Sequence, residues 1–140
     1  MAWSRALVWL AVGTIACVTI SGCGAGRREG TAHIQGTVTL GGQPLPANAQ
    51  ANITIAPAEK GRSAGAVVSD GRYDCPDAPV GKVKVYFSVM RPTGKMITET
   101  DNRPYAEMGS IIASKYASGI DLEITGDNAN QDFDLEPAQR

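Results

Sequence analysis

The chain has 140 residues, among them 16 glycines, 8 prolines and one histidine, and its formal net charge is −1. This length predicts a single domain, and the abundance of glycine and proline favours an all-β protein with short strands and tight turns. Charges of both signs are interspersed along the chain without a basic stripe, which excludes a nucleic-acid-binding protein.

The N-terminal segment has the layout of an export signal. Met1–Arg5 carries one positive charge, and Ala6–Ile20 is a run of fifteen residues without any charge. The run is short for a membrane span, which needs about 20 apolar residues, but it fits the apolar region of a signal peptide. It is followed by Ile20-Ser21-Gly22-Cys23, which is an aliphatic residue, two small residues and a cysteine. This tetrapeptide resembles the lipobox of bacterial lipoproteins.

The lipobox resemblance implies that residues 1–22 are a helical signal peptide that is removed, and that Cys23 is the lipid-bearing first residue of the mature protein. A lipoprotein cysteine carries at least two acyl chains, and two chains are enough for stable anchoring. Residues 23–31 are rich in glycine and charge, and we expect them to be a flexible tether. The protein is therefore expected at the bacterial cell membrane or outer membrane, with its domain facing the periplasm or the exterior. The alternative is an ordinary signal peptide that happens to precede a cysteine.

Beyond the tether, apolar and polar residues alternate with a period of two, which is typical of half-buried strands. The clearest strand places four large apolar side chains on one face: Val83, Val85, Phe87 and Val89. Burial of each such side chain stabilises a fold by about 1.5–3 kcal/mol. Seven strands are expected in all, separated by turn-forming residues and ending before Pro137: Ile34–Leu40, Ala51–Ala56, Ala64–Ser69, Arg72–Cys75, Val83–Met90, Ile120–Ile124 and Asp132–Glu136. This pattern predicts an all-β sandwich or barrel.

Three sequence pieces carry a further resemblance, in this order: Gln35–Pro46 (QGTVTLGGQPLP), Ser69–Tyr73 (SDGRY) and Ala78–Val85 (APVGKVKV). Behind a lipobox, they are similar to the carboxypeptidase regulatory-like family, whose domain is a seven-stranded transthyretin-like (prealbumin-type) β-sandwich of Ig-like architecture. The resemblance implies one such domain over residues 32–136, followed by a tail at 137–140. Hydroxyisourate hydrolases share the fold, but the chain has one histidine and lacks the Tyr-Arg-Gly-Ser tail of that family.

The three cysteines of the chain are expected to have different roles. Cys17 falls in the signal peptide and Cys23 is assigned to lipidation, so Cys75 is alone in the domain and no internal disulfide is expected. Because free cysteine is among the most buried residue types, we expect Cys75 to be an apolar core residue. The alternative is a reactive or intermolecular thiol.

One long segment, Arg91–Gly109, has no clear periodicity and is expected to be an irregular loop. Loops of this length are uncommon in small domains and are often functional. A contact surface is therefore expected here first, and the alternative is a solvated surface loop. The candidate contact residues are Arg91, Lys95, Arg103 and Tyr105.

The sequence offers no convincing active site, so no catalytic, cofactor-binding or metal-binding residue is predicted and no cofactor is expected. The single histidine, His33, stands at the edge of the first expected strand, beside the tether, and is expected to be exposed. Four carboxylates occupy strand positions opposite the core and are expected on the solvent face: Asp121, Glu123, Asp132 and Asp134. Three more lie near one turn and could hold a hard cation, but their spacing does not match an EF-hand loop: Asp70, Asp74 and Asp77.

Together these features predict a membrane-tethered, non-catalytic lipoprotein of the cell envelope. It would bind an envelope protein or a polysaccharide, or act as a structural module, through loops or an exposed strand edge. Two alternatives remain open. One is a subunit of an envelope transport or secretion assembly, and the other is a hydrolase that uses surface carboxylates.

Overall fold

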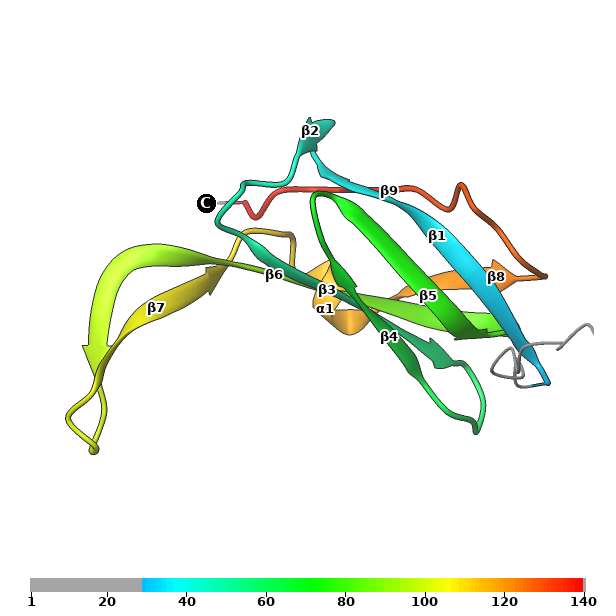
Figure 1. Cartoon of the computed structure of the whole chain (residues 1–140), viewed down its shortest axis with the longest axis horizontal. Coiled ribbons are helices and arrows are strands. Elements are labelled where there is room, and N and C mark those ends of the chain that lie inside the picture. Colours follow the sequence, from blue (N-terminus) through cyan, green and yellow to red (C-terminus); the bar gives the residue numbers. More distant parts are fainter. Residues whose placement is uncertain (1–28, 140) are drawn as a thin grey trace, which may run out of the picture.

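The computed structural model describes residues 29–139 of the chain (Figure 1). The expected signal peptide, the lipidation site at Cys23 and most of the expected tether lie outside the described residues. Within residues 29–139, no helix is long and apolar enough to cross a membrane. The described elements are nine strands and one short helix: β1 (Thr31–Leu40), β2 (Gln43–Pro44), β3 (Gln50–Pro57), β4 (Ala64–Val68), β5 (Arg72–Pro79), β6 (Gly81–Thr98), β7 (Pro104–Ser110), α1 (Lys115–Ser118), β8 (Ile120–Ile124) and β9 (Phe133–Leu135).

The strands form two sheets that share one core. In the first sheet, β2, β1 and β5 are neighbours in that order, and β9 pairs with β1 in parallel. In the second sheet the order is β4, β3, β6 and β7, and β8 pairs with the first part of β6. The predicted all-β sandwich is therefore confirmed. The described residues contain two strands beyond the seven expected, because β2 pairs over two residues only and β7 comes from the segment expected to be a loop.

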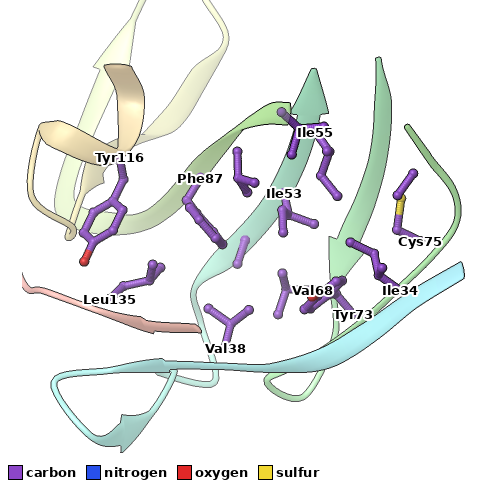
Figure 2. Close-up of a cluster of buried hydrophobic side chains, with 14 of the residues drawn as sticks. Ile34, Val38, Ile53, Ile55, Val68, Tyr73, Cys75, Phe87, Tyr116 and Leu135 are labelled. Atoms are coloured by element: carbon purple, nitrogen blue, oxygen red, sulfur yellow. The ribbon is translucent and has the colours of Figure 1, made fainter. Parts of the chain in front are cut away.

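The core between the sheets follows the period-two pattern of the sequence. On β3, Ile53 is 1% exposed and Ile55 is 0% exposed, while the four inward side chains of β6 are 0–3% exposed. Figure 2 shows these strands facing Ile34 and Val38 of β1 across the core. The inward faces expected for these three strands are thus confirmed. Cys75 on β5 is 1% exposed and joins the same core, as expected.

A four-residue helix, α1, follows β7 and was not expected from the sequence. It carries Tyr116 into the core, where the ring meets that of Phe87 edge-on with 5.8 Å between centroids. The Tyr116 hydroxyl also accepts a hydrogen bond from the backbone N–H of Glu136 at 2.9 Å. A helix of one turn shows no amphipathic period in a sequence, so only the packing of Tyr116 reveals it.

β5 is longer than expected, because the segment at 76–82 is not a connection. The strand continues through Pro76 to Pro79, and β6 begins at Gly81. β5 pairs only with β1 and is therefore an edge strand, and Pro76 lies at the register shift between Ala32 and Ile34, where a proline is tolerated. Its end pairs with Thr31, so β1 includes the last residue of the expected tether.

The C-terminal latch, residues 131–136, runs closely beside β1, and its strand β9 pairs with β1 in parallel. The Tyr73 hydroxyl donates a hydrogen bond to the backbone oxygen of Gln131 at 2.6 Å. The latch approaches β1 so closely that a Cβ atom on Gly36 would lie 2.0 Å from that same oxygen. Real Cβ atoms do not approach an oxygen so closely, so this approach requires glycine at position 36.

The segment expected to be a loop is instead a long β-hairpin, which we call the arm (residues 91–109). β6 and β7 pair from Met90 opposite Ser110 to Thr98 opposite Pro104. Figure 1 shows this hairpin extending from the sandwich. The prediction of an irregular loop is therefore wrong. Its prolines, glycines and mixed charges resemble a loop, and a register shift between Pro92 and Met96 interrupts the alternation that marks a strand.

Candidate functional site

The arm carries all four candidate contact residues, but it spreads them along its length. Arg91 lies at the base, and Lys95 lies within the register shift of β6. Tyr105 is opposite Ile97, and Arg103 directly precedes β7 near the tip. All four candidates are exposed. They therefore do not converge on one binding point, and any contact they make must follow the ribbon.

One face of the arm is polar and internally bonded. Tyr105 and Ile97 are opposite each other, so they share this charged face with Glu99 and Glu107, two positions away on each strand. The Tyr105 hydroxyl donates to Glu99 Oε1 at 2.6 Å, and Thr93 Oγ1 donates to Glu107 Oε2 at 2.5 Å. The hydrogen bond to Glu99 raises the pKa of Tyr105. The charged face thus holds the ribbon together from one side.

The other face of the arm is apolar and uncovered. Its members follow from the register, in which Met96 lies opposite Ala106 and Thr98 opposite Pro104. We define the apolar face as Met96, Thr98, Pro104, Ala106 and Met108, and none of these side chains is charged. The Met96 side chain is 64% exposed, which is unusual for a large hydrophobic residue. Sequence reasoning missed this face, although the alternation at 104, 106 and 108 was a usable signal.

Both edges of the arm are open as well. β7 pairs with β6 only, and beyond Met90 the pairing of β6 with β3 has ended. Within the described residues, the arm is therefore a two-stranded ribbon, and an isolated ribbon of this kind is marginally stable in water. Open strand edges are also templates for pairing with another chain. The arm combines both features with an exposed apolar face.

A polar cluster lies at the opposite end of the molecule, where β1 begins. His33 Nε2 lies 2.6 Å from Asp74 Oδ1, and Gln35 donates to the other oxygen of that carboxylate at 3.1 Å. The backbone N–H of His33 also donates to Asp127 Oδ1 at 2.9 Å. The His33 side chain is 36% exposed, so the expectation of a simply exposed histidine is only half right. A strand partner in the fold, Asp74, supplies a contact that the local sequence does not show.

The carboxylates of the C-terminal latch accept hydrogen bonds from β1 and the turn after it. Asp132 Oδ1 accepts from the backbone N–H of Thr37 at 2.7 Å and from its hydroxyl at 2.9 Å. Asp134 Oδ1 accepts from the backbone N–H of Gly42 and from the Thr39 hydroxyl, both at 2.8 Å. These bonds, led by those to the backbone, lower the pKa of both aspartates. A lowered pKa suits a carboxylate that holds a strand and opposes a role as general acid.

The other two expected solvent-face carboxylates lie apart from the latch, on β8. Asp121 forms an ion pair with Lys84 at 2.9 Å, and this pair raises the pKa of Lys84. Glu123 lies opposite Lys82 in the ladder of β6 and β8. Each carboxylate is therefore placed beside its own cation on the neighbouring strand.

The surface has open depressions in the described part of the chain. One of them has a volume of ≈ 720 Å³ and brings Asp74 and Asp132 to one hollow beside Arg72. Among residues 29–139, no group of three or more histidines, cysteines or acids is placed to hold a metal ion, and Asp70, Asp74 and Asp77 form no such group. Burial raises the pKa of the Cys75 thiol, which opposes reactivity there.

No protein-family model, curated protein or solved structure matches the chain.

Proposed function

We propose that the chain is a lipid-anchored, non-catalytic protein of the bacterial cell envelope, and that it binds a protein partner through the arm. The observation that carries the proposal is the exposed apolar face on a ribbon whose two edges are open. A monomeric domain has no need of this ribbon, because its core is complete without it. Uncovered apolar side chains on a projecting element are typical of interaction surfaces.

The start of β1, which follows the proposed anchor in the sequence, lies at a different end of the described structure from the arm. The first residue of β1, Thr31, follows Cys23 by only eight positions. Along the longest axis in Figure 1, β1 begins at one end and the arm occupies the other. β6 joins the two ends with 18 residues, or about 60 Å if fully extended. Attachment through Cys23 therefore leaves the arm free for a partner.

A protein fits the arm better than a polysaccharide does. The apolar face offers methionine, alanine and proline, and Thr98 is its single hydroxyl. Sugar chains are bound through many directed hydrogen bonds, whereas an open strand edge pairs with the backbone of another protein chain. Binding of a protein partner is also compatible with a role of this chain as a subunit of an envelope transport or secretion assembly. We also propose that the domain is carboxypeptidase regulatory-like, and this likeness supports a non-catalytic module.

The anchor is tested with Cys23→Ser. This change removes the thiol that would carry the lipid, so the protein should lose metabolic labelling with a fatty-acid probe and leave the membrane fraction. Cys75→Ser is the control, because its buried thiol has no part in anchoring and labelling should persist. Persistent labelling of the Cys23→Ser protein would contradict the anchor.

The arm is tested by cross-linking the full lipidated protein in intact cells with a permeable amine-reactive reagent. We expect the wild type to form an adduct larger than the monomer. Met96→Ser should lose that adduct, because it places a hydroxyl at the most exposed point of the apolar face. Val67→Ser is the matched control, since Val67 is 68% exposed on β4 and away from the arm. Equal adducts from both variants would show that the arm is not the contact surface.

A further inference from the structure

We propose that the protein partner of the arm is a second copy of this chain, and that the two β7 edges pair as antiparallel strands about a two-fold axis through Ala106. The inference rests on the proposed function, because it assumes that the arm is the contact surface. It adds the identity of the partner and the register of the contact.

The two edges of the arm are not equally fit for pairing, and β7 is the better one. On β6, the edge contains Pro92, which has no N–H, followed by the register shift and by Gly94 with φ +88°. Prolines, bulges and lysines protect strand edges from unwanted pairing. The β6 edge has all three features, since Lys95 supplies the lysine. On β7, a proline stands only at the first residue, Pro104, and the rest of the strand runs without a bulge. Both edges are thus unpaired in this chain, but only the β7 edge is free of features that block pairing with another strand.

The sequence of β7 is complementary to itself in this register. With Ala106 opposite Ala106, Pro104 lies opposite Met108 and Tyr105 lies opposite Glu107. The first pair is apolar and extends the apolar face across both copies. The second sets a phenol against a carboxylate. Arg103 also comes to lie diagonally across from Glu107 of the second copy, at a spacing where long opposite charges interact.

Neighbouring registers are worse. An axis through Glu107 would place this glutamate opposite itself, and like charges directly opposite each other are destabilising. An axis through Tyr105 would leave only three residues of each β7 in the ladder, since the strand begins at Pro104. The Ala106 register pairs five residues and opposes no like charges.

The pairing also suits two anchored molecules. Antiparallel arms carry the two bodies to opposite ends of the pair, each with the start of its β1 at the far end from the arm (Figure 1). A two-fold axis along the membrane normal then brings both anchors to the same membrane. Confinement to one membrane raises the effective concentration of the copies and favours a contact of modest area.

The register is tested by oxidative cross-linking of the full lipidated protein in membranes, with Ala106→Cys as the probe. Cys75 is 1% exposed and Cys23 is lipidated in the proposal, so the new thiol is the accessible one. Directly opposite residues have Cα atoms about 4.5–5.5 Å apart, which a disulfide can bridge. Copper phenanthroline with oxygen accepts the two electrons and two protons released as two thiols become one disulfide. We expect a covalent dimer that a reductant reverses.

Lys95→Cys is the matched control on the other edge of the arm. In the proposed pair, position 95 of one copy is separated from position 95 of the other by three strand spacings, about 14 Å, so no disulfide should form between them. Equal dimer at positions 95 and 106 would indicate random collision, and it would overturn the register. No dimer at position 106 would overturn the self-pairing.

A charge swap gives a second readout. Glu107→Arg alone, in a protein without an introduced cysteine, should lower several-fold the fraction of dimer captured by the amine-reactive reagent. The new arginine would lie diagonally across from Arg103 of the second copy, and the two like charges would repel each other. Adding Arg103→Glu should restore the dimer. Within one chain the two residues are four positions apart in extended backbone, about 13 Å, so the rescue must act between chains. A double variant no better than the single one would contradict the pairing.

Failure of this inference and failure of the proposed function give different results. If Ala106→Cys forms no dimer while Met96→Ser still abolishes an adduct with another protein, the self-pairing is wrong and the arm remains the contact surface. If no adduct of any kind depends on Met96, both proposals fail.

Discussion

The sandwich and the arm are made from the same strand, β6, and differ in what surrounds it. In the sandwich, β6 lies between β3 and β8 and buries four side chains in the core. In the arm, the same strand has one neighbour, β7, and leaves Met96 64% exposed. Burial accounts for the first half of β6. It does not account for the second half, where Ile97 is only half-buried and Met96 is exposed.

The difference separates two parts of one strand by what their residues contribute to the fold. The sandwich residues satisfy a core and a hydrogen-bond ladder, and they explain why the domain folds. The arm residues add little to that stability, since a two-stranded ribbon without a core is marginal. Their arrangement, with one bonded face and one bare face, is what the proposed contact with another protein would require.

The largest contrast is expected from the same substitution made in the two regions. Ile55→Ala removes a side chain that is 0% exposed in the core and should lower the free energy of unfolding by about 2–5 kcal/mol. Ile97→Ala in the arm should lower the free energy of unfolding by less than about 1 kcal/mol, because the Ile97 side chain is only half-buried. Urea unfolding followed by circular dichroism measures both. Equal losses would mean that the arm shares the core.

A second contrast separates two strand glycines of the sandwich. Gly36→Ala would place a Cβ 2.0 Å from the Gln131 oxygen, so the latch must shift, at a cost of about 1–3 kcal/mol. Gly65→Ala is the control, because its Cβ would find its nearest neighbour at 3.5 Å. Thermal unfolding of the two variants should show a clear loss for Gly36→Ala only. Matching midpoints would refute the close approach of the latch to β1.

The latch should also make the stability of the sandwich depend on pH. The pKa of both Asp132 and Asp134 is lowered from the ordinary value of 3.8 in the folded state. Their contribution is therefore complete above that value and is lost as pH falls through the lowered folded pKa. A series of unfolding curves from pH 6 to pH 2 should show the wild type losing this contribution below about pH 4. The double variant Asp132→Asn, Asp134→Asn should lose less, and a steeper loss in the variant would contradict the latch.

The smallest effect on folding is expected in the arm itself. Met96→Ser should change the free energy of unfolding by no more than about 0.5 kcal/mol, because the side chain is already in water. Differential scanning calorimetry on the purified wild type and variant checks this. A loss of 2 kcal/mol or more, on the scale of a core substitution, would mean that Met96 is structural.

The sequence was sufficient to predict the sandwich. Alternation in β1, β3 and β6 identified the strands and their buried faces, because one-sided burial leaves a period of two. The burial of Cys75 followed from its type and its lack of a partner cysteine. These features depend on local pattern, which a sequence displays directly.

The parts that escaped prediction depend on contacts between distant segments. The arm was expected to be a loop because the register shift near Lys95 hides its alternation. The bond between His33 and Asp74 joins residues 41 positions apart. The requirement for glycine at position 36 arises from Gln131, and Tyr116 reveals α1 only through its ring contact with Phe87.

The central claim is that the arm, and not the body of the sandwich, meets another protein. Site-specific photo-cross-linking tests it most directly, with a photoreactive amino acid placed at Met96 or at Val67 in the full lipidated protein in living cells. The two side chains are similarly exposed, at 64% and 68%, and differ in region. The account predicts a discrete protein adduct from position 96 and none from position 67. An adduct from position 67 with none from position 96 would contradict it.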